Sequence, residues 1–140
     1  MTMELLPFFE MISLEGQSMA GASSRAASAI EQKLRASGKP WCAVSGWVLI
    51  DMVSPDGAVP LPEPMLPMIM YAHHVQIDNS HRLRGGDSVM SGFATSYNQD
   101  GVFETAGTIY ILMGRGFRKE ADASVVRAAQ LRLSDTTLTS

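Results

Sequence analysis

Residues 68–118 read MIMYAHHVQIDNSHRLRGGDSVMSGFATSYNQDGVFETAGTIYILMGRGFR, and this stretch decides the fold class. Its apolar, strand-like runs are separated by Gly, Asn and Asp at the spacing of β-hairpins. Asn98–Gly101 is the clearest turn, because an Asp-Gly pair readily adopts the positive φ angles of a tight hairpin. Strands are predicted on either side of it, at Val89–Tyr97 and Val102–Met113, and a third at Ile69–Asp78. The stretch therefore predicts a compact antiparallel sheet.

A further strand is predicted upstream, at Trp41–Met52 (WCAVSGWVLIDM). Side chains alternate between the two faces of a strand. One predicted face carries Trp41, Ala43, Ser45, Trp47 and Leu49, and the other carries Cys42, Val44, Gly46, Val48 and Ile50. Both faces are largely apolar, which is typical of a central strand that is covered on both sides.

Two helices are predicted to flank the sheet. Residues 17–37 place an apolar stripe on one helical face, made of Met19, Ala26, Ala27, Ile30 and Leu34. Gly38 and then Pro40 end this helix, because glycine suits a C-terminal cap and proline cannot continue a helix. Asp122 is placed to cap a second helix that ends near Leu133.

Together these elements predict one α+β domain at residues 1–133, followed by a polar, frayed tail at 134–140. The expected fold is a twisted, mostly antiparallel sheet of about four to five strands, with one long N-terminal helix packed on it and a short C-terminal helix. Residues 1–16 fit either a helical turn or a strand.

The composition is that of an ordinary globular protein of 140 residues, with 46% hydrophobic and 18% charged residues. The net charge is −3, and the eleven Lys and Arg are scattered, which disfavours general nucleic-acid binding. Cys42 is the one cysteine and excludes an internal disulfide. No apolar run approaches the ~20 residues of a membrane helix, and no basic start of a secretory signal is present. We therefore expect a cytoplasmic protein without a membrane partner.

Residues Ser54–Pro67 hold five of the seven prolines. Proline fixes φ and cannot donate to a β-ladder, so an extended loop is predicted. Met65 also begins a methionine cluster with Met68 and Met70, and methionine suits adaptable binding surfaces as well as irregular cores. The apolar loop residues are therefore candidates for a protein-binding face; they are Val59, Leu61, Met65 and Leu66.

Four residues are the closest approach to a metal cluster: His73, His74, Asp78 and His81. Adjacent strand residues face opposite sides, and His74 and Asp78 would be roughly 13 Å apart along an extended strand. No metal and no other cofactor is therefore expected. An alternative interpretation is a small ligand-binding or enzymatic pocket near His73, Asp78 and Arg82.

Two basic segments interrupt the acidic chain, one at Arg82 and Arg84 and one at Arg115–Arg118. If both project from the same end of the sheet, they form a local positive patch for a phosphate, a nucleic-acid strand or an acidic protein. Phe117 could stack on a base or anchor the C-terminal helix. The predicted partner-binding residues are Leu61, Met65, Leu66, Arg82, Arg84, Arg115, Phe117 and Arg118, with nucleic acid the less favoured partner.

No catalytic residue is predicted. Cys42 lies within a strand and has no neighbouring base, so a buried, inert thiol is expected. Asp51 and Glu104 are acids inside apolar runs, and either would serve as a general base only if it were buried. A non-enzymatic protein is therefore expected.

Four segments carry a family resemblance: PW-x4-GW at Pro40–Trp47, YAHHVQID at Tyr71–Asp78, RLRGGDSVMSG at Arg82–Gly92 and FETAGTIYILMGRGFRK at Phe103–Lys119. They resemble an uncharacterised domain-of-unknown-function family of pseudomonads and their prophages. The last segment fits that family's pattern best, through Phe103, Thr105, Thr108, Tyr110, Leu112, Gly114, Gly116 and Arg118. The chain departs from it at Met90, where the pattern has an arginine.

The resemblance implies no reaction and no ligand. It implies an accessory gene of a phage or prophage, and such genes often encode inhibitors of host systems. The expected function is thus a non-enzymatic protein that binds a bacterial host protein or complex, such as a CRISPR-Cas defence system that it would inhibit. An exposed edge strand would also permit a homodimer.

Overall fold

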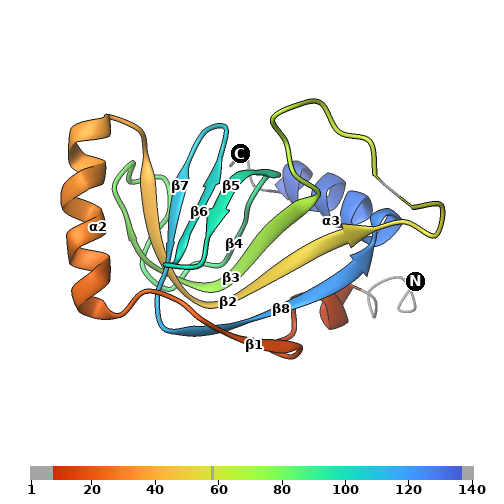
Figure 1. Cartoon of the computed structure of the whole chain (residues 1–140), viewed down its shortest axis with the longest axis horizontal. Coiled ribbons are helices and arrows are strands. Elements are labelled where there is room, and N and C mark those ends of the chain that lie inside the picture. Colours follow the sequence, from red (N-terminus) through yellow and green to blue (C-terminus); the bar gives the residue numbers. More distant parts are fainter. Residues whose placement is uncertain (1–7, 58, 137–140) are drawn as a thin grey trace.

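The computed structural model describes residues 8–57 and 59–136, without the side chains of residues 132–136. Along the chain the elements are a helical segment at residues 8–12, β1 (Gln17–Ala20), α2 (Ser24–Ser37), β2 (Trp41–Val53), β3 (Met68–Asp78), β4 (Val89–Met90), β5 (Ala94–Asn98), β6 (Val102–Thr105), β7 (Ile109–Leu112), β8 (Arg115–Asp122) and α3 (Ala123–Thr136) (Figure 1). The predicted fold is wrong. Eight strands of the described chain form one mixed sheet, in place of about four to five mostly antiparallel strands under one long helix.

The central strand is β2, and its two edges differ. One edge pairs antiparallel with β3 along most of its length. The other edge is shared by two strands, because β7 runs parallel to Trp41–Val44 and β8 runs parallel to Val48–Val53. Beyond them, β6 and β5 extend from β7, β1 flanks β8, and β4 flanks β3. The parallel pairs join strands that are distant in sequence, so no hairpin signal could predict them.

The long N-terminal helix predicted at residues 17–37 is wrong in its first part. Gln17–Ala20 pairs with β8 as strand β1. The helix begins at Ser24 because Ser23 is its N-cap, with its Oγ accepting a hydrogen bond from the Ala26 N–H at 3.1 Å. Its end is as predicted, since Gly38 follows the helix in the left-handed conformation with φ 75°.

Two predicted strands are each two strands in the structure. Val89–Tyr97 divides into β4 and β5, and Val102–Met113 is the hairpin of β6 and β7. Thr105 and Thr108 close that hairpin, since the Thr108 N–H donates to Thr105 Oγ1 at 3.1 Å and the Thr105 N–H donates to the Thr108 carbonyl at 2.9 Å. The turn at Asn98–Gly101 is confirmed between β5 and β6.

The C-terminal part contains one element that was predicted and one that was not. Strand β8 was not predicted, because its sequence RGFRKEAD does not alternate clearly. The following helix α3 is capped by Asp122, whose Oδ1 accepts the Ser124 N–H at 2.8 Å. Helix α3 continues through Thr136, within the segment 134–140 that was expected to be a tail, and residues 137–140 lie outside the described chain.

The side-chain alternation predicted for β2 is wrong beyond Ser45. Gly46 has φ 59°, a left-handed conformation that interrupts the regular pleat. Cys42 and Val44 therefore share one core cluster with Trp47 and Leu49. The opposite face carries Trp41 and Ala43 before the interruption, and Val48, Ile50 and Met52 after it.

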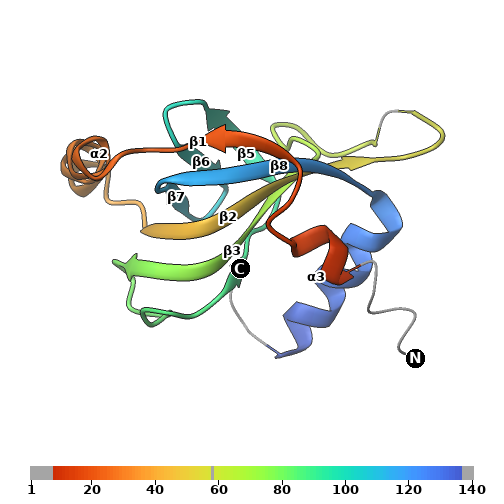
Figure 2. The ribbon, with the colours of Figure 1, turned by 90° about the horizontal axis from the view of Figure 1, so that it is seen from below.

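The sheet is curled around its first core cluster, which includes Val89 of β4, Ala94 of β5 and Phe103 of β6 as well as the β2 residues. The helices cover the other face of β2 at its two ends (Figures 1 and 2). Helix α2 contributes Ala27 to a cluster with Trp41. Helix α3 and the segment at residues 8–12 pack with Val48, Ile50 and Ile69. The 54–67 loop, which joins β2 to β3, lies at the α3 end.

Candidate functional site

The 54–67 loop is held in place at its C-terminal end. The Met52 N–H donates to the Pro67 carbonyl at 2.8 Å, and the Leu66 N–H donates to the Ala94 carbonyl at 2.7 Å. The second bond attaches the loop to β5, an edge strand. Within the loop, the Met65 N–H donates to the Pro62 carbonyl at 2.9 Å. These bonds fix the backbone that carries Met65 and Leu66.

Apolar side chains of the loop divide into two groups. Val59 and Leu61 are half-buried and pack against the cluster between the sheet and α3. Met65 and Leu66 are 38% and 41% exposed, although the backbone beneath them is hydrogen-bonded. Of the three loop residues predicted to bind a partner, Leu61 thus anchors the loop, and Met65 and Leu66 face solvent.

A small pocket lies at the opposite end of the sheet, where β2 begins and β3 ends. It encloses about 290 Å³ of empty space, including its open mouth, and is lined by Cys42, Asp78, Ser80, Arg82, Leu83, Val89, Thr108 and Tyr110. The structure therefore brings together Asp78 and Arg82 of the predicted pocket, but not His73.

The Asp78 carboxylate organises the loop above this pocket. Its Oδ1 accepts the Ser80 N–H at 3.0 Å and the Ser80 hydroxyl at 2.7 Å, and its Oδ2 accepts the Leu83 N–H at 2.8 Å. Burial alone would raise the pKa of Asp78, but these bonds and the charge of Arg82 together lower it. The carboxylate is thus ionised and already engaged within its own loop.

The floor of the pocket holds two groups that keep their protons. Burial, and secondarily the charge of Asp78, raise the pKa of the Cys42 thiol to about 12. Burial, and secondarily Cys42, raise the pKa of the Tyr110 phenol to about 12. A thiol with such a pKa is not a thiolate nucleophile at neutral pH.

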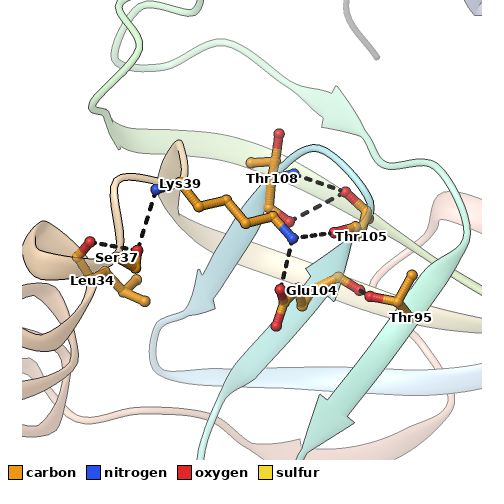
Figure 3. Close-up of polar contacts among 7 residues, drawn as sticks. All are labelled: Leu34, Ser37, Lys39, Thr95, Glu104, Thr105 and Thr108. Carbon is orange, nitrogen blue, oxygen red and sulfur yellow. Dashed lines mark hydrogen bonds and ion pairs between the residues drawn. The ribbon is translucent and has the colours of Figure 1, made fainter.

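The two acids considered as general bases are both in ion pairs. Lys39 Nζ donates to Glu104 Oε2 at 2.6 Å and to the Thr105 carbonyl at 2.7 Å, which fastens the end of α2 to the β6–β7 hairpin (Figure 3). Asp51 accepts two hydrogen bonds from Arg118, from Nε at 2.7 Å and from Nη2 at 2.9 Å. Both carboxylates therefore have structural partners.

The histidines do not converge. His73 Nε2 is 2.8 Å from the Ile12 carbonyl and thus contacts the N-terminal segment. His74 is exposed on β3, and His81 is exposed in the following loop with φ 61°. Among the described residues, no group of three or more His, Cys, Asp or Glu could hold a metal ion.

The two predicted basic segments lie on different elements. Arg82 and Arg84 are exposed in the loop between β3 and β4. Arg115 and Arg118 belong to β8, where Arg115 Nη1 is 3.4 Å from Ser18 Oγ and Arg118 is paired with Asp51. Phe117 is half-buried and packs with the α3 cluster, so its ring is not presented for stacking on a base.

Sequence reasoning missed the contacts made by Arg118. Besides Asp51, its guanidinium lies 5.9 Å from the centre of the Tyr97 ring on β5. Asp51 and Arg118 are 67 residues apart in the sequence. Only the parallel pairing of β2 and β8 brings them together, and no local signal in the sequence could have shown it.

Several residues of the motif at Phe103–Lys119 have structural roles. Gly116 lies against the ring of Trp47, and the Trp47 Nε1–H donates to the Met113 carbonyl at 3.1 Å. Gly114 has φ 71°, which favours glycine. Thr105 and Thr108 close the hairpin, and Arg118 pairs with Asp51 as described above. These residues of the motif therefore have structural roles in β6, β7 and β8.

The comparison with protein-family models finds a match over most of the chain. The family model described as "Domain of unknown function (DUF6957)" matches residues 17–128. No curated protein and no solved structure matches the chain. Among the described residues, no helix has both the length and the apolar character needed to cross a membrane.

Proposed function

The chain belongs to the DUF6957 family of domains of unknown function, and we propose that it is a protein-binding domain whose contact surface is the 54–67 loop. The observation that carries this proposal is the exposure of Met65 and Leu66 on a hydrogen-bonded backbone. Binding a partner orders few new residues when the contacting loop is already fixed, so less conformational entropy is lost. Exposed apolar side chains on such a loop are suited to the centre of an interface.

The pocket at the opposite end supports a ligand-binding or enzymatic role less well. Its carboxylate, Asp78, is satisfied by Ser80 and Leu83, and its thiol and phenol keep their protons. The basic segments also give less support to nucleic-acid binding, because Arg118 is engaged by Asp51 and Phe117 is packed.

For the partner, we propose a bacterial host protein or complex in the cytoplasm. The support is the resemblance of four sequence segments to a family of pseudomonads and their prophages, from which a phage or prophage accessory role follows by association. Inhibition of a defence system such as CRISPR-Cas is the specific form that we propose for this role.

A pull-down from a pseudomonad lysate tests the proposal. The tagged wild-type chain is compared with Met65→Ser/Leu66→Ser and with a matched control, Ile77→Ser, because Ile77 is 53% exposed on β3 beyond the loop. We expect one stoichiometric protein, identified by mass spectrometry, to be captured by the wild type and by the control and lost with the double variant. Equal capture by the double variant would refute the role of the loop. Light scattering of the purified chain tests the homodimer.

A further inference from the structure

We propose that the 54–67 loop recognises a segment that combines apolar side chains with lysine or arginine. This inference rests on the proposed function, because it names the chemistry of the partner for the same loop. Two properties of this end of the sheet carry it: the exposed apolar pair on the loop, and an excess of negative charge on the loop and on the strand ends beside its start.

Apolar contact is provided by Met65 and Leu66. Pro64 precedes and Pro67 follows this pair in the sequence. The Leu66 N–H donates to the Ala94 carbonyl. The flexible thioether of methionine adapts to partners of different shape. The pair therefore suits aliphatic or aromatic side chains of a short segment better than one rigid surface.

The loop itself contributes only negative charge. Residues 40–81 contain no Lys and no Arg, while the loop carries Asp56 and Glu63. Both are exposed, and within the described part of the chain neither takes part in an ion pair. Glu63 lies two positions before Met65 in the sequence, so the loop carries a negative charge close along the chain to the apolar pair.

The strand ends below the loop add to this charge. The parallel register of β2 and β8 places Glu120 beside Asp51 and Asp122 beside Val53, the residue before the loop. The two strands run side by side toward the loop in Figure 1. Glu120 and Asp122 are both exposed. This end of the sheet thus presents four exposed carboxylates, at Asp56, Glu63, Glu120 and Asp122.

Among the described side chains, two of the basic residues at this end already have hydrogen-bond partners. Arg118 is held by Asp51. Lys119 Nζ donates to the Glu10 carbonyl, the Ser13 carbonyl and Ser13 Oγ at 2.7 to 2.9 Å. These three acceptors are neutral, so Lys119 keeps its positive charge. Arg127 of α3 is exposed, and Lys119 and Arg127 together offset two of the four carboxylate charges. The net electrostatic field at this end of the sheet is negative, and it favours a cationic partner segment over an acidic one.

The two parts of the surface make different contributions. Apolar burial at Met65 and Leu66 sets how long a partner remains bound, whereas charge at the rim of an interface mainly sets the association rate. Glu63→Lys is therefore expected to slow association about three- to tenfold at low salt, with little change in dissociation. The effect shrinks at high salt, because exposed charges are screened.

The test is a selection of short random peptides displayed on yeast, with the purified 140-residue chain as bait. Enriched peptides are then measured by biolayer interferometry against the wild type, Met65→Ser/Leu66→Ser and Glu63→Lys. Ile77→Ser and Asp100→Lys are the matched controls, since both positions are exposed and lie outside the loop. Circular dichroism confirms that each variant is folded.

Enriched peptides that combine apolar and basic residues, lose binding to the double variant and associate more slowly with Glu63→Lys support the inference. Peptides that need Met65 and Leu66 but show no basic preference overturn the inference and leave the proposed function intact. Peptides that bind the double variant as well as the wild type overturn both. A selection that enriches nothing also overturns the inference, and the pull-down then decides the proposed function separately.

Discussion

Gly116→Ala tests the close packing of β8 on β2. A Cβ atom at this position would meet three carbon atoms of the Trp47 ring within 2.5 Å, whereas real Cβ atoms essentially never approach closer than 3.0 Å. The Trp47 ring is fully buried, and its Nε1–H donates to the Met113 carbonyl. Displacing the ring would therefore disturb the surrounding core and break this hydrogen bond. We therefore expect the strand and the ring to separate.

The magnitude follows from two costs. Overpacking of a rigid core costs typically 1–3 kcal/mol, about 2 kcal/mol for a rigid ring. Displacement of the ring also breaks the bond between Trp47 and Met113, which contributes about 1 kcal/mol. The free energy of unfolding should thus fall by about 3 kcal/mol. With about 2.1 cal/mol/K of unfolding entropy per residue, this corresponds to a decrease in Tm of roughly 10 °C.

Urea denaturation followed by far-ultraviolet circular dichroism measures this change, with Gly92→Ala as the control. A Cβ at Gly92 would meet nothing within 4 Å, so that variant should lie within about 0.5 kcal/mol of the wild type. The reasoning is refuted if Gly116→Ala is as stable as Gly92→Ala. Tryptophan fluorescence gives a second readout, because the environment of Trp47 should change in Gly116→Ala only.

Three further predictions concern the polar groups. Since burial, and secondarily Asp78, raise the pKa of Cys42 from 9.0 to about 12, the stability linked to this thiol is complete below pH 9 and is lost as the pH rises toward 12. At neutral pH a thiol reagent should label native Cys42 only at the rate of unfolding, and rapid labelling would contradict this. Asp78→Asn should cost about 1–2 kcal/mol and speed hydrogen exchange at the Leu83 amide, because an amide group cannot replace both acceptor oxygens. An unchanged Leu83 exchange rate in Asp78→Asn would count against this account. The pKa of Asp78 is lowered from 3.8 in the folded state, so the stability that Asp78 contributes is present above pH 3.8 and is lost as the pH falls through the folded-state pKa. The side chains of Asp51 and Arg118 are 28% and 31% exposed. A double-mutant cycle with Asp51→Asn and Arg118→Met should therefore give a coupling free energy of about 1 kcal/mol. A coupling of zero would show that the bidentate pair does not stabilise the sheet.

Local features were predictable from the sequence because their causes lie within a few residues. The turn at Asn98–Gly101 follows from an Asp-Gly pair, and the end of α2 follows from Gly38. The cap of α3 at Asp122 and the loop at Ser54–Pro67 are of the same kind. In each case glycine, proline or a short polar side chain restricts the backbone at its own position.

The candidate site was predictable only in part. Proline and methionine content identified the loop, but the exposure of Met65 and Leu66 and the anchoring of Leu61 depend on what the loop packs against. The sequence placed Asp78 near Arg82, since they are four positions apart, and it suggested His73 as well. The structure instead directs His73 toward Ile12, a contact with no sequence signal.

By itself, the sequence determined where the chain turns, which segments are apolar enough to become strands, and that one cysteine precludes an internal disulfide. Only the tertiary structure decided how those strands pair. The parallel placement of β7 and β8 along one edge of β2, the interruption at Gly46 and the pairing of Asp51 with Arg118 all depend on residues that are distant in the sequence. Strand register is selected by the burial of whole faces and by the hydrogen bonding of complete strands, so tertiary packing overrides local propensity at these positions.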